Sequence, residues 1–339
     1  GDDAETVTNV TTSSTVQTFD IGLDKDLASD AFEGATITFN VIVQAMQYRN
    51  TGDGEWDNIL SEELLSSRND LHACYQNLAL AQKGVLADSL FHYPQCPPNG
   101  LVIDWKGSRQ QSDLLSDVFW LQGNVAQAQK MAFDAVYFDK YFMHPRLMLR
   151  LVETNLVYGE YDVAEKYIRL CEQSHYYADK ATEYRKYLPE EGGSLSEGPL
   201  AEVEKCLPGY EDAILANFYK DMQGVLSGHP GYLPAVHYLG CKLLLDNNLE
   251  VFKFFMENIC DAKQLNPMPL HFQEALLMIY DEETCKEYGV TEQTIAKYHD
   301  FQDKIAKVKT QNDVVAIYKA GYGKTFWVHS NIYEKQTRK

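Results

Sequence analysis

Apolar positions along this chain recur at helical spacing in three stretches, and a glycine interrupts each of them. The turn glycines Gly84, Gly123 and Gly159 are 39 and 36 residues apart, close to the period of helix-turn-helix repeats. One such hairpin cannot bury its apolar face alone and must stack on a neighbour. The pattern therefore predicts clear repeats over about residues 70–178. The three stretches are Asn77–Cys96, Leu115–Ala135 and Leu151–Cys171.

The segments on either side of these repeats are less regular. Residues 1–34 are rich in Thr and Ser and lack a helical period, which predicts an extended or partly disordered arm with a possible strand near Val16–Ile21. A helical pattern begins at residue 35, and the loop 188–198 marks a joint before degenerate hairpins at 199–330. We therefore expect one α-solenoid domain over residues 35–339.

The predicted helices of the second half follow from apolar residues at three- and four-residue spacing. The last of them ends at Gly321, because glycine is the usual residue at a helix C-terminus. They are Asp212–Val225, Leu233–Asp246, Leu249–Cys260, Phe272–Ile279, Thr291–Lys307 and Gln311–Ala320.

Composition supports an all-α class and limits the kinds of partner. Helix-compatible residues dominate from about residue 55, whereas β-branched runs lie mainly before residue 45. The 49 acidic residues outnumber the 30 basic ones and give a net charge of −19. That charge repels a phosphate backbone, so nucleic acid is not an expected partner.

Seven cysteines are widely spaced and form no CxxC pair, which argues against zinc, redox chemistry and a disulfide framework. We expect most of them, Cys171 included, to be small buried apolar residues. This weakly favours a reducing compartment. No apolar run approaches the roughly 20 residues that a membrane-spanning helix needs.

The third stretch, LVETNLVYGEYDVAEKYIRLC, resembles a tetratricopeptide repeat. Leu115–Ala135 fits the same pattern, whereas the segment around Leu239 has Phe252 where the family has a small residue. The resemblance implies an α-α superhelix, a tetratricopeptide-like solenoid with degenerate C-terminal hairpins, that binds a partner on its concave face. The matching positions are the turn glycine, turn aromatic, small residues and large apolar residue at Gly159, Tyr161, Ala164, Ile168 and Cys171.

Several longer phrases are similar to an uncharacterised family of gut-bacterial proteins that combine N-terminal membrane spans with a helical C-terminal region. The similarity covers most residues from about 45 to the end. It implies a soluble domain of a membrane-associated protein, attached through a region absent from this chain, and leaves the side of the membrane open. The phrases are WDNIL, NLALAQKG, FHYPQ, RLVETNLVYGEYDVAEKY and GKTFWVHSNIY.

The pattern GYGKT at residues 321–325 looks like the end of a phosphate-binding loop but lacks its first glycine, because Tyr318 occupies that position. We interpret it as a helix cap that leads into an aromatic tail packed on the last helices. The histidines are scattered, and neither HExxH nor GxSxG is present. The sequence therefore predicts no catalytic, cofactor-binding or metal-binding residue.

The favoured hypothesis is a non-enzymatic protein-protein interaction module that holds a protein or peptide. Its candidate contacts are three polar helix residues, since such side chains can hydrogen-bond an extended chain, and two aromatic residues at the end of the third repeat. The competing interpretation is structural, with the polar groups satisfied internally and the rings filling joints between repeats. The candidates are Asn77, Glu153, Asn155, Tyr176 and Tyr177.

The alternative hypothesis is a carbohydrate-binding or glycoside-hydrolysing helical protein. It would use aromatic platforms and a pair of carboxylates on the same scaffold. Two carboxylates about 5–10 Å apart in a deep aromatic cleft would favour it, whereas an open, shallow groove would favour partner binding. Helical repeats host many functions, so the fold alone does not decide.

Overall fold

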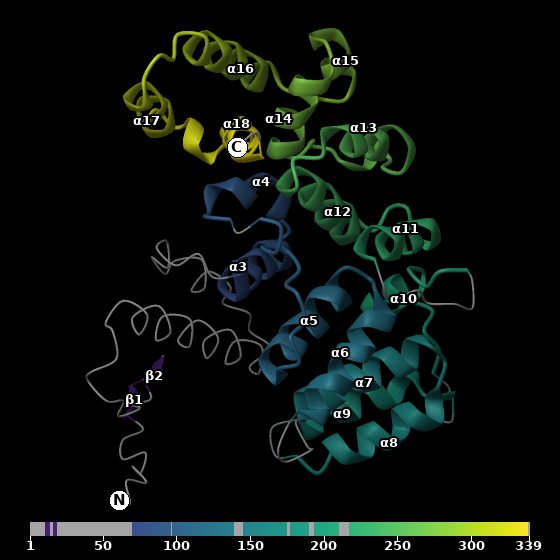
Figure 1. Ribbon diagram of the computed structural model, residues 1–339. Helices are drawn as coiled ribbons and strands as arrows, with labels where there is room; N and C mark the ends of the chain where they lie inside the picture. The colour runs from purple at the N-terminus through teal and green to yellow at the C-terminus, as the bar shows by residue number, and fades with distance from the viewer. Residues whose placement is uncertain are drawn as a thin grey trace, which may run out of the picture.

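The structure, a computed structural model, describes residues 11–13, 16–18, 70–95, 97–138, 145–174, 177–189, 193–209 and 217–337. These residues form α-helices joined by short turns, with one antiparallel pair of strands, β1 (Thr11–Ser13) and β2 (Val16–Thr18). The helices stack into a superhelix (Figure 1), which confirms the predicted all-α class. The predicted boundary of the arm at residue 34 lies outside the described residues.

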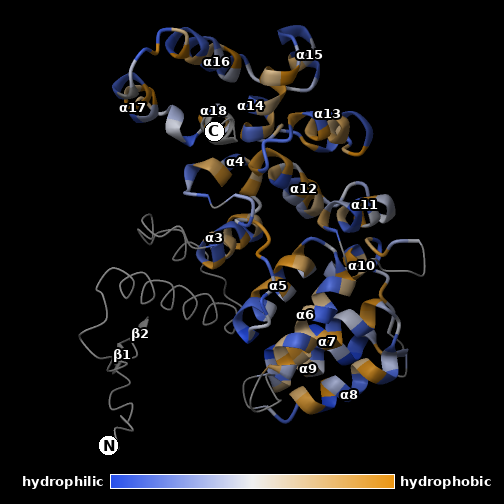
Figure 2. Cartoon of the chain, in the orientation of Figure 1, coloured by the Kyte–Doolittle hydropathy of each residue, from blue (hydrophilic) through white to orange (hydrophobic). Residues whose placement is uncertain are grey.

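The second and third predicted hairpins form and pack on each other. They consist of α5 (Arg109–Leu121) with α6 (Val125–Tyr137), and α7 (Pro145–Val157) with α8 (Tyr161–Cys171). Gly123 closes the first of these turns with a φ of +76°, in the left-handed region that glycine enters without strain. Orange and blue segments alternate along α6, α7 and α8 in Figure 2, as amphipathic helices require.

Small residues let these helices approach each other closely. Ala164 and Cys171 on α8 are fully buried, and the Cys171 thiol donates to the carbonyl of Pro145 at the start of α7 (3.6 Å). Burial raises the pKa of Cys171 to about 12, so the thiol stays protonated. This confirms the prediction that Cys171 is a core residue.

The first predicted hairpin has a different position from the other two. Its helices are α3 (Asp70–Gln82) and the short α4 (Leu86–Ser89), separated by Gly84 with a φ of +72°. Although α3 contacts α5, α4 packs against α12 (Leu233–Leu245) and α14 (Leu270–Ile279). The three hairpins therefore do not stack as one uninterrupted row over residues 70–178, because the second helix of the first hairpin belongs to the other half of the molecule (Figure 1).

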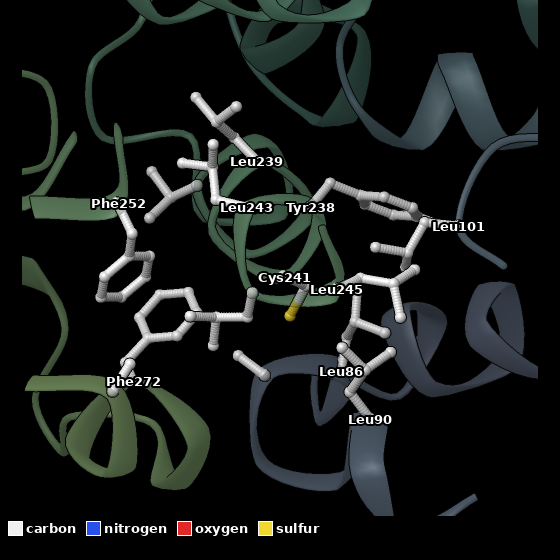
Figure 3. Close-up of a cluster of buried hydrophobic side chains, with 14 of the residues drawn as sticks. Leu86, Leu90, Leu101, Tyr238, Leu239, Cys241, Leu243, Leu245, Phe252 and Phe272 are labelled. Carbon is white, nitrogen blue, oxygen red and sulfur yellow. The ribbon is translucent and has the colours of Figure 1, made fainter. Parts of the chain in front are cut away.

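Two hydrophobic clusters hold the helices together. The larger one, the first core, joins α3, α4 and α5 to the helices of residues 218–337, and Figure 3 shows Leu86 and Leu90 directed toward the side chains of α12. The second core extends from Val125 at the start of α6 through α7 and α8 to Val203, and includes Val152, Ile168 and Leu200. Trp120 is half-buried and packs against both cores, so it marks the seam between them.

Each of the six helices predicted for the second half has a counterpart in the structure, and the start of the first one lies outside the described residues. The second half also contains three helices that the pattern did not predict. The additions are α10, α15 and α18. Because α18 follows the turn at Gly321, the predicted last helix is not the last. The remaining helices are α9 (Ala178–Glu183), α10 (Pro199–Glu204), α11 (Phe218–Gly228), α13 (Leu249–Asn258), α15 (Glu282–Glu287), α16 (Glu292–Ile305), α17 (Gln311–Lys319) and α18 (Phe326–Thr337).

The C-terminal aromatic residues pack as the sequence predicts. Phe326 and Trp327 at the start of α18 are fully buried, and the Trp327 ring stacks on Phe301 of α16 with centroids 5.5 Å apart. Glu274 of α14 anchors this start: its carboxylate accepts from the Phe326 N–H (2.8 Å), and its carbonyl accepts from the Trp327 indole N–H (2.8 Å). The interpretation of residues 321–325 as a cap before a packed aromatic tail is confirmed.

Candidate functional site

A cleft of about 630 Å³ opens at the seam between the two cores. One wall comes from the ends of α3 and α5 and from α7, and consists of Gln82, Trp120, Leu121 and Glu153. The second wall comes from α9 and the 3₁₀ turn Tyr184–Tyr187, and consists of Lys180, Glu183, Tyr184, Lys186 and Tyr187. The third comes from α10 and the residue before α12, and consists of Pro199, Leu200, Glu202, Val203 and Tyr232.

The interior of the cleft is apolar and aromatic. Leu200 and Val203 are buried members of the second core, and both belong to the short helix α10. The rings of Tyr184, Tyr187 and Tyr232 are half-buried around them. Apolar walls with a few placed polar groups are typical of ligand sites, since burial supplies affinity and the polar groups supply orientation.

A buried guanidinium supports the wall formed by α5 and α7. The Arg150 guanidinium lies 4.5 Å from the centroid of the Trp120 ring, a cation-π distance. Its Nη1 donates to Glu153 Oε2 (2.6 Å), and its Nη2 donates to Asp117 Oδ1 (3.1 Å). Loss of water around the guanidinium lowers the pKa of Arg150, and the charge of Glu153 acts in the opposite direction. The two carboxylates thus compensate the guanidinium for the water that it has lost.

This contact is part of a ladder of charges between α5 and α7. Arg146 donates from Nη1 to both oxygens of Asp117 (3.1 Å each) and forms an ion pair with Asp113 one turn earlier. We call Asp113, Arg146, Asp117, Arg150 and Glu153 the α5–α7 ladder. Charge-assisted hydrogen bonds of this kind are geometrically demanding, so the ladder sets the register of the two helices and with it the position of Glu153.

The Tyr184 hydroxyl completes the ladder at the cleft. It donates to Glu153 Oε1, so each oxygen of that carboxylate has a donor. Burial, and then the neighbouring Glu153 charge, raise the pKa of Tyr184 well above its usual range. The hydroxyl therefore keeps its proton at neutral pH, and its hydrogen bond orients the Glu153 carboxylate.

The charges at the rim are of two kinds. Glu202 binds Lys205 (2.6 Å) and His229 (3.0 Å), and these hydrogen bonds, that of Lys205 first, lower the pKa of Glu202. Lys180 and Lys186 are exposed, and within the described part of the chain neither has a carboxylate oxygen within 4.0 Å of its ammonium. The Lys186 ammonium lies 4.9 Å from the centroid of the Tyr187 ring.

Of the five predicted contacts, the structure places Glu153 in the cleft. Tyr177 is half-buried against the second core and does not line the cleft, and burial raises its pKa. Tyr176 lies outside the described residues. The aromatic pair is therefore not a part of the site that the structure describes.

Asn77 and Asn155 are buried and cannot reach a partner in this conformation. Asn77 Nδ2 donates to Gln95 Oε1 and to the carbonyl of Gly100, each at 2.8 Å. These bonds hold the loop that follows α4, to which both acceptors belong, against α3. Asn155 Nδ2 donates to the Leu151 carbonyl one turn earlier (2.6 Å). Both side chains satisfy internal groups, so we do not retain them as contacts.

Most of the cleft was absent from the sequence analysis. Trp120, Arg150, Tyr184 and Tyr232 are not close in sequence and fit no motif. Trp120, Tyr184 and Tyr232 lie at or near helix ends, which the apolar period does not assign to either face, and Arg150 lies in the middle of α7. No local signal therefore predicts that these residues meet.

Among the described residues, no group of three His, Cys, Asp or Glu side chains is placed to hold a metal ion. In the same described part of the chain, no helix is long and apolar enough to cross a membrane. Two of the carboxylates that line the cleft form ion pairs, Glu153 with Arg150 and Glu202 with Lys205.

The fold and the cleft define a class: all-α proteins built of stacked helical hairpins with an aromatic cleft between two packed halves. The chain belongs to a family of unknown function (DUF6057), whose model matches residues 40–331. No curated protein and no solved structure matches the chain.

Proposed function

We propose that this chain is a non-enzymatic, tetratricopeptide-like interaction module that binds a peptide segment of a partner protein in the cleft at the seam. The observation that carries the proposal is the cleft itself, an apolar and aromatic interior flanked by oriented polar groups. Such a site accepts an apolar anchor side chain while the tyrosine hydroxyls and rim charges contact the flanking backbone and side chains.

The tetratricopeptide-like character is part of the proposal. It is supported by the hairpins α5–α6 and α7–α8, whose turns have left-handed glycines and whose crossings have buried small residues such as Ala128 and Ala164. From the resemblance to proteins with membrane spans, we further propose that the module is attached to a membrane through a region outside this chain.

Binding is better supported than catalysis by the state of the carboxylates. A glycosidase needs one carboxylic acid that keeps its proton near neutral pH. Hydrogen bonds to Lys205 and His229 lower the pKa of Glu202, which makes it poorly suited to act as a general acid. Both oxygens of Glu153 already accept hydrogen bonds within the chain, from Arg150 and Tyr184.

A carbohydrate ligand is the second candidate, favoured by one observation. Three tyrosine rings and a tryptophan ring share the cleft with three carboxylates, a combination that sugar-binding sites also use. The test below therefore includes both classes of ligand.

The test pans a random peptide library against the chain and against two single variants, and screens the same proteins on a glycan array. Tyr187→Ala removes a ring from the cleft, and Tyr137→Ala removes an exposed ring of α6 as the matched control. We expect peptides that bind the wild-type chain and the control but bind Tyr187→Ala at least about tenfold more weakly. Peptides that bind all three proteins equally, or selection of glycans instead of peptides, would overturn the proposal.

A further inference from the structure

The charges that line the cleft do not cancel completely. Arg150 pairs with Glu153 and with Asp117, and Glu202 pairs with Lys205 and accepts from His229. Two lysines and Glu183 remain, all exposed and all on the wall formed by α9 and the following 3₁₀ turn. This one wall therefore carries two positive charges and one negative charge, in a chain whose net charge is −19.

The two lysines are placed to meet a ligand rather than another part of the chain. Lys180 belongs to the last turn of α9, and Lys186 follows on the 3₁₀ turn beside the Tyr187 ring. An ammonium group that loses water when a ligand covers it must gain a new partner, or binding loses affinity. A carboxylate is the partner that compensates for this loss.

The other two walls of the cleft select the apolar part of the ligand. Leu200 and Val203 present aliphatic surface, and Trp120 presents an aromatic ring whose other contacts include the Arg150 guanidinium. A single aliphatic or aromatic side chain can be buried there. A uniformly acidic segment would not use this surface, and it would be repelled by the rest of the molecule.

We propose, on the basis of the proposed function, that the cleft recognises a peptide segment with one large apolar residue flanked by Asp or Glu. The apolar side chain lies between Trp120 and α10, and the carboxylate lies between Lys180 and Lys186. The specificity then comes from the two lysines, and most of the affinity from the apolar contact.

The test measures binding of a fluorescein-labelled acidic-apolar peptide from the panning experiment by fluorescence anisotropy. The double variant Lys180→Glu/Lys186→Glu is compared with the control Lys307→Glu/Lys319→Glu, which makes the same change in net charge. Both control sites are exposed: Lys307 follows the end of α16, and Lys319 is the last residue of α17. We expect the cleft double variant to bind about tenfold more weakly and the control to bind within about twofold of the wild-type chain. Raising the salt concentration should weaken wild-type binding and narrow the difference.

Three outcomes would overturn the inference. These are selected peptides without acidic residues, equal losses in both double variants, and undiminished binding to the cleft double variant. In each case, peptide binding that is still weakened by Tyr187→Ala would support the proposed function while the inference about acidic residues fails. The failure of the inference can therefore be distinguished from the failure of the proposed function. Circular dichroism of both double variants checks that the exposed substitutions leave the helices intact.

Discussion

At the scale of single residues, Glu274 is the most demanding polar group in the first core. Its side chain is fully buried, and its Oε2 accepts from the Phe326 N–H and from Nδ1 of His271 (2.9 Å). His271 Nε2 accepts from the Phe91 N–H (3.3 Å), so the histidine is neutral with its proton on Nδ1. The Glu274 carboxylate thus connects α14 to the start of α18 directly, and to the turn after α4 through His271.

We expect Glu274→Ala to lower the free energy of unfolding by about 3 kcal/mol, because two buried donors lose their acceptor and a cavity forms. Urea unfolding followed by tryptophan fluorescence measures this change, since Trp327 lies against the site. The control Glu287→Ala removes an exposed carboxylate of α15 and should stay within about 0.5 kcal/mol. Equal effects of the two variants would contradict the role given to Glu274.

Arg150 has the corresponding role beside the cleft. Arg150→Met leaves Asp117 and Glu153 without their shared cation, so we expect a loss of about 3–5 kcal/mol. Arg169→Met breaks an exposed i,i+4 pair with Glu165 and should cost less than about 1 kcal/mol. Thermal unfolding of both variants tests the prediction, which fails if Arg150→Met is as stable as Arg169→Met.

At the scale of elements, the turn glycines differ although they look alike in sequence. Gly84 and Gly123 both have positive φ, but a Cβ on Gly84 would meet nothing within 4 Å. A Cβ on Gly123 would lie 2.8 Å from Cys206 Sγ, at the joint between the α5–α6 turn and the end of α10. Gly123 therefore serves both the turn and the contact between helices.

We expect Gly84→Ala to cost about 1 kcal/mol, the usual penalty for a left-handed alanine, and Gly123→Ala to cost about 2–4 kcal/mol because it adds overpacking. Chemical denaturation gives both values. The double variant Gly123→Ala/Cys206→Ala should recover part of the difference, since the shorter side chain relieves the contact. No recovery would mean that Cys206 is not the group that is displaced.

At the scale of the whole molecule, buried histidines connect stability to pH. Burial is the largest cause of the lowered pKa of His72, His237 and His329, and their neutral forms are the ones that the fold accommodates. In the unfolded chain these groups titrate near 6.5. The unfolded state therefore binds more protons below that pH, and folding stability falls as the pH falls.

We expect the urea midpoint to be constant between about pH 7 and 8 and to decrease from about pH 6.5 downward. The decrease continues until the pH falls below the lowered pKa values that the three histidines have in the folded state. The combined loss is of order 1–3 kcal/mol by pH 5. His329→Gln, which keeps a polar side chain next to the Leu245 carbonyl, should reduce the slope of this decrease. A midpoint that rises as the pH falls would contradict the sign.

Local patterns in the sequence determined the parts of the fold that depend on neighbours in the chain. The glycine turns at 84, 123 and 159, the core position of Cys171 and the helix end at Gly321 all follow from backbone preference and apolar period. The buried Phe326 and Trp327 follow in the same way, because a short aromatic segment after a cap has to be covered by preceding helices.

Tertiary structure alone decided which element covers which face. Hydrophobic burial has no direction, so the apolar face of α4 could pack on α5 or on α12 and α14, and the chain uses the latter. The same holds for the cleft: Trp120, Glu153, Tyr184 and Val203 meet because α10 turns back onto α7. Period and spacing identify an apolar face, but the partner of that face depends on the shape of the whole molecule.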